Sequence, residues 1–196
     1  MIDSELINPK ISVIISTFNQ DKYIGRCIRS LLEQNISKDK YELIIINDGS
    51  TDRTEYAIGL FRKPNSNFIK YLSNEINIGL PASINKGINI AKGDYIVRVD
   101  SDDFVNKNFL NFLAIYLETN PESDAVACDY LVLDDNENVI ENNVVTTHIR
   151  NFVPLCSYCT FSVDLLKVNI KVINIIIEYT YYSIWQRIVN LKILIL

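Results

Sequence analysis

The chain has 196 residues, of which 19 are Lys or Arg, 24 are Asp or Glu and one is His, and its formal charge is −5. The length suits one domain with a short appendage, and 48% hydrophobic against 22% charged residues predicts a globular fold rather than disorder. The acidic balance argues against a general nucleic-acid binder, because such a protein needs a basic face to neutralise phosphates.

Cysteine usage and apolar runs bear on where the protein works. Four cysteines at this length do not make a disulfide scaffold, and the first residues have neither the basic nor the apolar segment of a secretory signal. No stretch of about 18 uncharged apolar residues occurs, so we expect no membrane-spanning helix. We therefore expect a cytoplasmic protein. The hydrophobic run Ile188–Leu196 is expected to pack as a last core element, with contact to a membrane surface or to a partner as the alternatives.

Strand-like and helix-like segments alternate through the first two-thirds of the chain. Apolar, β-branched runs predict strands at Ile11–Ser16, Tyr41–Asn47, Phe68–Leu72, Asp94–Val99 and Ala125–Leu133. Apolar stripes predict helices at Asp21–Asn35, from near Asp52, from Pro81 to Ala91 and from Phe109 to Leu117. This alternation predicts an α/β fold with a doubly wound, mostly parallel sheet and helices on both faces.

Local signals mark where several of these elements begin and end. Asp52 and Glu55 resemble a capping box at the start of the second helix. Pro81 falls in the first turn of the third helix, and Gly93 lies just past its end. The turn Asp134–Asn138 predicts a β-hairpin after the fifth strand.

Polar residues follow three of the predicted strands. They are Ser16–Asn19 after the first strand, Asn47–Ser50 after the second and Asp100–Asp103 after the fourth. In open α/β sheets, ligands bind at the carboxyl ends of the strands, near a topological switch point. The sequence therefore predicts a polar, partly acidic ligand site at one edge of the sheet.

The acidic segment after the fourth strand is the sharpest signal for chemistry. One residue separates Asp100 from Asp102, so both carboxylates can reach one side of a strand end. Paired carboxylates suit Mg²⁺ or Mn²⁺, completed by water and phosphate oxygens, and such an ion would stabilise a diphosphate leaving group. The alternative is an Asp-rich turn that caps the following helix.

The segment Asn47–Ser50 also has two interpretations. In the first it is a strand-to-helix turn, in which Asp and Gly favour the turn and a nearby hydroxyl or carboxylate caps the helix. In the second, the Asp48 carboxylate accepts a hydrogen bond from a base N–H. The segment alone favours the first interpretation.

Signatures of several enzyme classes are missing from the sequence. No Gly-x-Gly-x-x-Gly follows the first strand and no Gly-x-x-x-x-Gly-Lys-Ser/Thr loop occurs, which disfavours dinucleotide oxidoreductases and phosphate-loop proteins. The only histidine, His148, lies far along the chain, which disfavours a Ser-His-Asp hydrolase. Cys156 and Cys159 form a lone Cys-x-x-Cys pair, without the second ligand pair that a zinc site needs.

Four segments together resemble a known family. They are Ile11–Asn19, Leu43–Asp52, Asn77–Gly87 and Ala91–Asp103, and they are similar to the successive signatures of family 2 glycosyltransferases with the GT-A fold. The resemblance implies a nucleotide-sugar-binding core over 1–133 and an acceptor-side region of the same domain over 134–196. It also implies a nucleotide-diphosphate sugar donor, most often a UDP-sugar, a divalent metal, and transfer with inversion to a glycan, a lipid-linked or another hydroxyl acceptor, as in the synthesis of cell-surface polysaccharide.

The resemblance also assigns roles to single residues. It gives donor-binding positions to Thr17, Phe18, Asp48, Asn77, Gly79, Asn85, Asp100 and Ser101. Thr17 and Phe18 would line the nucleotide pocket, and Asp48 would contact the base. Asp100 and Asp102 would hold Mn²⁺ or Mg²⁺, with Asp102 as the main ligand.

The general base is where the sequence departs from the family. An inverting transferase needs a group that takes the proton of the acceptor hydroxyl. Trp185–Arg187 resembles the family element that follows an acidic pair, but that pair falls at Thr180 and Tyr181. Glu178 is the nearest acid and is the candidate base.

This departure keeps other functions open. The missing acids and the Ile-, Asn- and Tyr-rich composition after Asn169 lead to the hypothesis that the tail is degenerate, shifted in reading frame or truncated. The alternative to an active transferase is then a pseudoenzyme or a nucleotide-sugar-binding module without a base. A nucleotidyltransferase is disfavoured, because Ser16–Tyr23 contains no Gly and Lys22 is its only basic residue.

Overall fold

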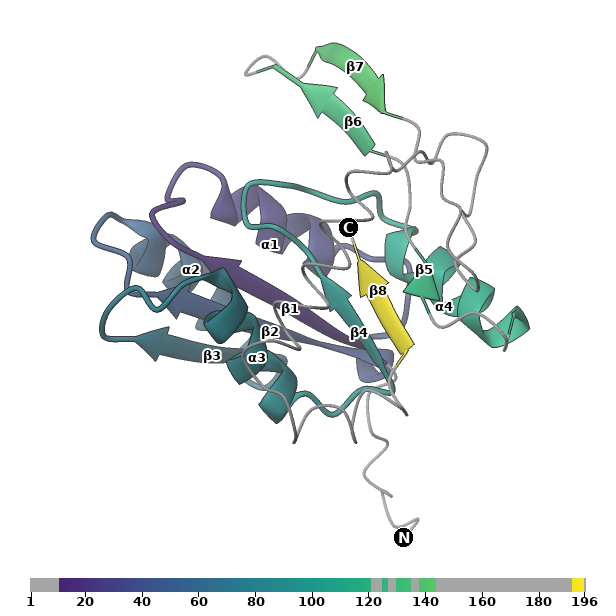
Figure 1. Ribbon diagram of the computed structural model, residues 1–196, viewed down its shortest axis with the longest axis horizontal. Coiled ribbons are helices and arrows are strands. Elements are labelled where there is room, and N and C mark those ends of the chain that lie inside the picture. Colours follow the sequence, from purple (N-terminus) through teal and green to yellow (C-terminus); the bar gives the residue numbers. More distant parts are fainter. Residues whose placement is uncertain (1–10, 121–124, 127–129, 135–137, 144–191, 196) are drawn as a thin grey trace, which may run out of the picture. The chain divides into compact units, whose positions relative to one another are not determined.

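A computed structural model describes residues 11–120, 125–126, 130–134, 138–143 and 192–195 (Figure 1). The chain divides into two compact units, Met1–Ala114 and Ile115–Leu196. In chain order the elements up to the start of the second unit are β1 (Ile11–Thr17), α1 (Ile24–Leu32), the 3-10 helix η1 (Lys38–Lys40), β2 (Tyr41–Asp48), α2 (Thr54–Arg62), β3 (Ile69–Asn74), α3 (Leu80–Ile90), β4 (Tyr95–Arg98) and α4 (Phe109–Thr119).

The strands of the first unit form a parallel sheet in the order β3-β2-β1-β4. Every residue of β2 is buried, and so is all but one residue of β1. The apolar run Leu43–Ile46 suits this place, because a strand inside a parallel sheet is covered on both faces. The predicted α/β fold is confirmed, and the predicted strands and helices of this unit are present with their ends shifted by a few residues.

Helices cover both faces of this sheet (Figure 1). The hydroxyl of Tyr41 in β2 donates to the Leu31 carbonyl of α1 at 2.8 Å. Ile46 of β2 and Ile14 of β1 lie against Gly87 of α3, where an added Cβ would come within 3.0 Å and 2.7 Å of their side chains. Successive side chains of a strand point to opposite faces, so α1 and α3 cover opposite faces of the sheet.

A buried hydrogen-bond network closes the end of the sheet where the strands begin. The Ser12 hydroxyl donates to Glu42 Oε1 at 2.7 Å and accepts from the Gly93 N–H at 2.8 Å, and the Lys92 N–H also donates to Glu42 Oε1. A Cβ on Gly93 would lie 2.6 Å from the Ser12 nitrogen. The close approach to β1 therefore explains why residue 93 is a glycine. It does not terminate the helix, because α3 already ends with the extended C-cap residue Ala91.

The start of α2 differs from the predicted capping box. Its N-cap is Arg53, whose side chain makes no capping hydrogen bond. Asp52 instead accepts a hydrogen bond from the Thr54 N–H at 2.9 Å. The predicted place of Pro81 in the first turn of α3 is confirmed.

The second unit contains β5 (Ala125–Val126), β6 (Tyr130–Leu133), β7 (Val139–Asn143) and β8 (Lys192–Ile195). β5 pairs with β8 in parallel, and β6 pairs with β7 as the predicted antiparallel hairpin. The single strand predicted over Ala125–Leu133 is wrong, because β5 and β6 belong to different sheets. The division of the chain into a nucleotide-sugar-binding core over 1–133 and an acceptor-side region over 134–196 stays a prediction.

Part of the sequence interpretation lies outside the described residues. It concerns His148, Cys156, Cys159, Glu178 and Trp185–Arg187. Of Ile188–Leu196, the structure describes β8 alone. Among the helices of the described ranges, none is long and apolar enough to cross a membrane.

Candidate functional site

A pocket of about 310 Å³ lies in the first unit, at the carboxyl ends of its strands. It is lined by Ser16, Phe18, Gln20, Asp48, Asn77, Leu80, Arg98, Asp100, Ser101 and Asp102. These residues come from β1, β2, β4, the first residue of α3, the segments that follow β1 and β4, and the segment that enters α3. The structure thus brings together polar residues that follow three separate strands.

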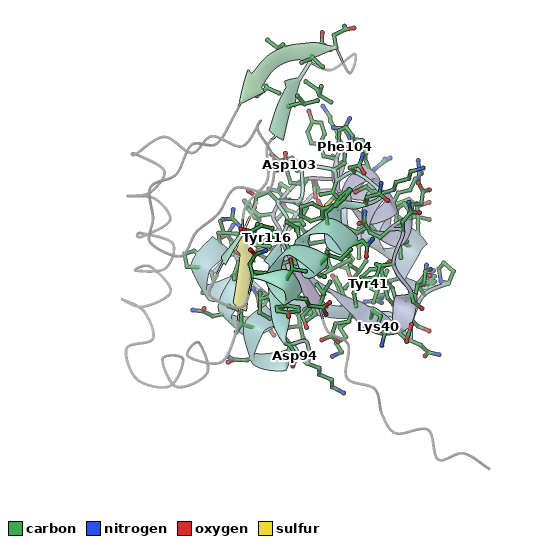
Figure 2. The ribbon with its side chains drawn as sticks, turned by 90° about the vertical axis from the view of Figure 1, so that its right-hand side faces the viewer. Lys40, Tyr41, Asp94, Asp103, Phe104 and Tyr116 are labelled. Atoms are coloured by element: carbon green, nitrogen blue, oxygen red, sulfur yellow. The ribbon has the colours of Figure 1, made fainter. Side chains whose placement is uncertain are left out.

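The direction of the strands explains why these residues meet. Figure 2 shows Asp103 and Phe104, just past β4, at the opposite end of the first unit from Lys40 and Asp94, which directly precede β2 and β4. All four strands of this unit are parallel, so their carboxyl ends share one edge. Ligands of open α/β sheets bind at that edge.

Most of the donor-binding residues predicted from the sequence line the pocket, and three do not. Thr17 is 2% exposed, and its Oγ1 is buried with no hydrogen-bond partner among the described residues. The same holds for Oδ1 of Asn85 in α3. Gly79 is the N-cap of α3 and has a φ of 90°. These three residues are not among those that line the pocket, and the donor-contact roles given to them stay predictions.

Asp48 ends β2 and is 2% exposed. Its Oδ1 accepts from Asn74 Nδ2 at 2.7 Å and from the Ile78 N–H at 3.0 Å, and its Oδ2 accepts from the Gly79 N–H at 2.9 Å. Next to it, Gly49 has a φ of 72°, and a Cβ there would lie 2.5 Å from the backbone of the segment that these amides belong to. Asp48 therefore holds the segment that enters α3.

These hydrogen bonds also set the ionisation of Asp48. Burial raises the pKa of its carboxyl group, but hydrogen bonds from Ile78, Asn74, Ser83 and Gly79 lower it further than burial raises it. The net effect holds the pKa of Asp48 below its usual value. The carboxylate is therefore charged at neutral pH although it is buried.

The acidic side of the pocket is built differently. Arg98 donates from Nε to Asp100 Oδ1 at 3.0 Å, and its Nη2 donates to the same oxygen. Asp102 is exposed. Burial raises the pKa of the neighbouring Asp103, and the negative charges of Asp102 and Asp100 raise it further. The carboxylates at this edge therefore repel one another, and a bound cation would relieve the repulsion.

Helix α1 is hydrogen-bonded to the acidic segment that follows β4. The Cys27 thiol donates to the Asp100 carbonyl at 3.5 Å, and the Ser30 hydroxyl accepts from the Val105 N–H at 3.1 Å. Burial raises the pKa of Cys27, and the charge of Asp103 raises it further, so the thiol stays protonated. The buried stripe of α1 predicted from the sequence thus also fixes the backbone that carries the carboxylates.

Asp100 and Asp102 fit a hard divalent cation as ligands, since both carboxylates line one pocket. In the described part of the chain, no group of three or more His, Cys, Asp or Glu side chains is arranged to hold a metal ion. The two carboxylates would therefore need further oxygen ligands from water and from substrate phosphates. Mg²⁺ is commonly held this way, by one or two carboxylates plus phosphate oxygens.

Four lining residues received no individual site role from the sequence: Ser16, Gln20, Leu80 and Arg98. Of these, Ser16 belongs to the polar segment Ser16–Asn19 expected at this edge. Strand position gives a signal for Ser16 and Arg98. Ser16 and Thr17 point to opposite faces of β1, so only one of the two can face the pocket. Arg98 ends β4 two residues before Asp100, within the predicted strand Asp94–Val99, and pairs with that carboxylate. Gln20 and Leu80 lie outside the strands, where no such periodicity applies.

A family model described as glycosyl transferase family 2 matches residues 12–156 of the chain. The chain belongs to this family. The resemblance inferred from the four sequence segments is confirmed.

Relatives with known names and structures agree with this membership. EpsH of Bacillus subtilis (strain 168), named as a glycosyltransferase, is 31% identical over 141 residues, which are 71% of this chain and 39% of EpsH. The crystal structure of Staphylococcus aureus TarS 1–349 in complex with UDP is similar, with a TM-score of 0.57 at 30% identity, over 68% of this chain and 38% of that one. TarS is named a poly(ribitol-phosphate) beta-N-acetylglucosaminyltransferase.

A more distant structure supports the fold alone. The mannosyltransferase of Pyrobaculum calidifontis in complex with GDP-Man and Mn²⁺ has a TM-score of 0.58 at 23% identity, over 66% of this chain and 37% of that one. The GT-A fold expected from the motifs is confirmed. The chain spans 39% of EpsH and 38% of the TarS chain, well under half of either.

Proposed function

We propose that the chain is a metal-dependent glycosyltransferase that moves a sugar from a nucleotide-diphosphate donor to a hydroxyl acceptor with inversion. The observation that carries the proposal is the composition of one pocket. It combines the side chain of Phe18, 43% exposed, with the carboxylates of Asp100 and Asp102. An aromatic side chain suits a planar base, and a carboxylate pair suits a cation that accompanies a diphosphate. UDP is the first candidate nucleotide, because the similar TarS structure holds it.

Each part of the pocket has a role in this proposal. The ring of Phe18 would stack on the base. Asp48 would keep the segment that contains Asn77 in place beside the nucleotide. Asp100 and Asp102 would hold Mn²⁺ or Mg²⁺, which supplies charge neutralisation of the diphosphate as it leaves.

The acceptor side belongs to 134–196 in this proposal, as the acceptor-side region of the same domain. TarS is named for a poly(ribitol-phosphate) acceptor, so a cell-surface polymer with free hydroxyls is one acceptor class to try. A glycan or a lipid-linked hydroxyl is another, and the latter would place the protein at the periphery of a membrane. Glu178 is the candidate general base.

A second function differs only in the last step. If no residue of the chain acts as the base, the chain is a nucleotide-sugar-binding module or a pseudoenzyme. Thr180 and Tyr181 favour this alternative, because neither offers a carboxylate where the family has an acidic pair.

A thermal-shift titration of the full chain tests the donor site. UDP, GDP and dTDP are each added with and without Mn²⁺, to the natural chain and to Asp102→Asn. A ligand at 100 times its dissociation constant stabilises the fold by about 2.7 kcal/mol, which is roughly 5 to 10 °C for a chain of this size. We expect a shift with UDP that needs Mn²⁺ and is absent in Asp102→Asn.

The outcomes separate the two functions. No shift with any nucleotide, from a cooperatively folded sample, would overturn donor binding and both functions with it. Binding of UDP-sugars without release of UDP to any hydroxyl acceptor would favour the binding module. Turnover that Glu178→Gln leaves unchanged would exclude Glu178 as the base.

A further inference from the structure

The segment after β1 is tied to the segment after β2 by the side chain of Asn19. Its Oδ1 accepts a hydrogen bond from the Thr51 N–H at 2.9 Å and lies 3.4 Å from the Thr51 hydroxyl, which also donates to it. Its backbone N–H donates in return to the Ser50 hydroxyl at 3.0 Å. The two segments are 31 residues apart in sequence, so these bonds are tertiary contacts and do not belong to a local turn.

The next two residues continue the same connection. The Gln20 N–H donates to the Thr54 hydroxyl at 2.8 Å, and the Asp21 N–H donates to Asp52 Oδ2 at 3.2 Å. Three consecutive backbone amides of the first segment are therefore held by side chains of the second. We call these residues, Asn19–Asp21 and Ser50–Thr54, the loop clamp.

The clamp is anchored in the buried sheet. The Ser50 N–H donates to Asn47 Oδ1 at 3.1 Å, and Asn47 Nδ2 donates to the Tyr71 hydroxyl at 3.3 Å. Asn47 is 2% exposed at the end of β2. Its amide accepts one bond and donates another, which a carboxylate at this position could not do.

The backbone at Asn19 indicates that the conformation is required by its surroundings. Its φ is 54°, and among the described residues other than glycine it alone has a positive φ. Asn tolerates this left-handed region better than most residues do, but it adopts it rarely. Such conformations persist where surrounding contacts fix them, and they cluster at ligand sites.

The residues on either side of Asn19 face the pocket. Phe18 and Gln20 both line it, and the Phe18 side chain is 43% exposed. A ring that is 43% exposed is held less by packing than a buried one, so its direction depends more on the backbone that carries it. That backbone is fixed by the clamp.

We propose that Asn19 is a positioning residue of the donor site, whose side-chain amide fixes the clamp so that Phe18 and Gln20 face the bound nucleotide. This inference rests on the proposed function, since it needs a nucleotide in the pocket. Asn19 does not line the pocket and acts through its neighbours. The clamp thus prepares the base side of the site before the ligand arrives, which lowers the ordering cost of binding.

The test compares three substitutions of Asn19 in the full chain, with UDP and Mn²⁺ as the probe and calorimetry as the readout. Asn19→Gly keeps the positive φ accessible and removes the amide. Asn19→Ala removes both. Asn19→Asp keeps an acceptor oxygen for the Thr51 N–H. We expect UDP to bind roughly tenfold more weakly to the Gly and Ala variants and within threefold of the natural affinity to the Asp variant.

A matched control removes a similar bond away from the pocket. Asn108 Oδ1 accepts from Asn35 Nδ2 at 2.6 Å, and neither residue lines the pocket. Asn108→Ala is expected to leave UDP affinity unchanged. If the chain turns over, the Asn19 variants are expected to raise KM and to leave kcat within twofold, whereas partial unfolding would lower kcat.

The results distinguish this inference from the function it rests on. Natural affinity in Asn19→Gly and Asn19→Ala would overturn the positioning role and leave donor binding intact. The same weakening in Asn19→Asp as in Asn19→Ala would also overturn it, because the acceptor oxygen would then be irrelevant. A natural chain that binds no nucleotide would overturn the proposed function, and the role of the clamp with it.

Discussion

Two carboxylates at the same edge of the sheet differ in burial and in hydrogen bonding. Asp48 ends β2, is 2% exposed, and accepts two bonds from backbone amides and one from the Asn74 side chain. Asp102 follows β4, is exposed, and lies in a segment with two further aspartates. Hydrogen bonds hold the pKa of Asp48 below its usual value, whereas like charges help to raise the pKa of Asp103 beside Asp102.

The comparison shows how one residue type serves two purposes. The charge of Asp48 is satisfied inside the protein, so it fixes the segment that enters α3. The charges around Asp102 are balanced only in part: Arg98 pairs with Asp100, and Arg98 and Arg26 lower the pKa of Asp103 by less than burial and the neighbouring carboxylates raise it. We expect that surplus to cost some stability and, under the proposed function, to leave affinity for an external cation. We therefore assign a structural role to the Asp48 carboxylate and a ligand-binding role to the Asp102 carboxylate.

The largest expected effect comes from breaking the internally satisfied carboxylate. In Asp48→Asn, an amide NH₂ replaces one acceptor oxygen and faces the donors that Asp48 now accepts from. Buried donors left without partners cost about 1–3 kcal/mol each, so we expect a loss of roughly 3 kcal/mol in the free energy of unfolding, measured by urea denaturation. Asp94→Asn, an exposed carboxylate at the other end of the sheet, is the control and should change it by less than about 0.5 kcal/mol.

The pH dependence of this difference follows from the lowered pKa of Asp48. A carboxylate with a depressed folded pKa contributes stability above its unfolded pKa of about 3.9, and the contribution is lost as the pH falls through the folded pKa. The stability gap between the natural chain and Asp48→Asn should therefore be constant above about pH 5 and shrink below pH 4. A gap that stays constant into strong acid would contradict the assignment of the charge to Asp48.

Removing Asp102 should have the opposite sign while no ligand is present. Asp102→Asn takes away a charge that raises the pKa of Asp103, so the substituted chain should be equal to the natural chain or more stable by up to about 0.5 kcal/mol. With UDP and Mn²⁺ the order should reverse, because only the natural chain gains from the ligand. A large loss of stability in Asp102→Asn without ligand would mean that this carboxylate also belongs to the fold.

The contrast also explains what the sequence could and could not predict. Periodic signals sufficed for the fold of the first unit: the run Leu43–Ile46 predicted a buried strand, and the stripe of α1 predicted its buried face. The run Ala125–Leu133 misled, because periodicity does not show which partner each part of a strand pairs with. The Asp-x-Asp spacing predicted a pair of carboxylates, because Asp100 and Asp102 are only two residues apart in the sequence.

The hydrogen bonds that Asp48 accepts could not be predicted from the sequence, because the donors are distant from it along the chain. Its hydrogen-bond donors lie 26 to 31 residues further along the chain, on β3 and in the segment before α3. The partners of Asn19 are equally distant. Local pattern identifies which residues gather at an edge, but only the tertiary structure shows which of them are already satisfied there.

Arg98 gives the sharpest test of the contrast, with a small expected effect on stability. Its ion pair with Asp100 is partly exposed, so Arg98→Gln should cost less than about 1 kcal/mol of stability, and less still at high salt. The same change removes a positive charge beside the two proposed metal ligands, so Mn²⁺ alone should bind a few-fold more tightly, as calorimetry can measure. At saturating Mn²⁺, UDP should bind more weakly to Arg98→Gln, because Arg98 lines the pocket and its charge favours phosphate. If Mn²⁺ binds Arg98→Gln no more tightly than the natural chain, the acidic edge is already neutral, and its exposed carboxylates are not the cation site.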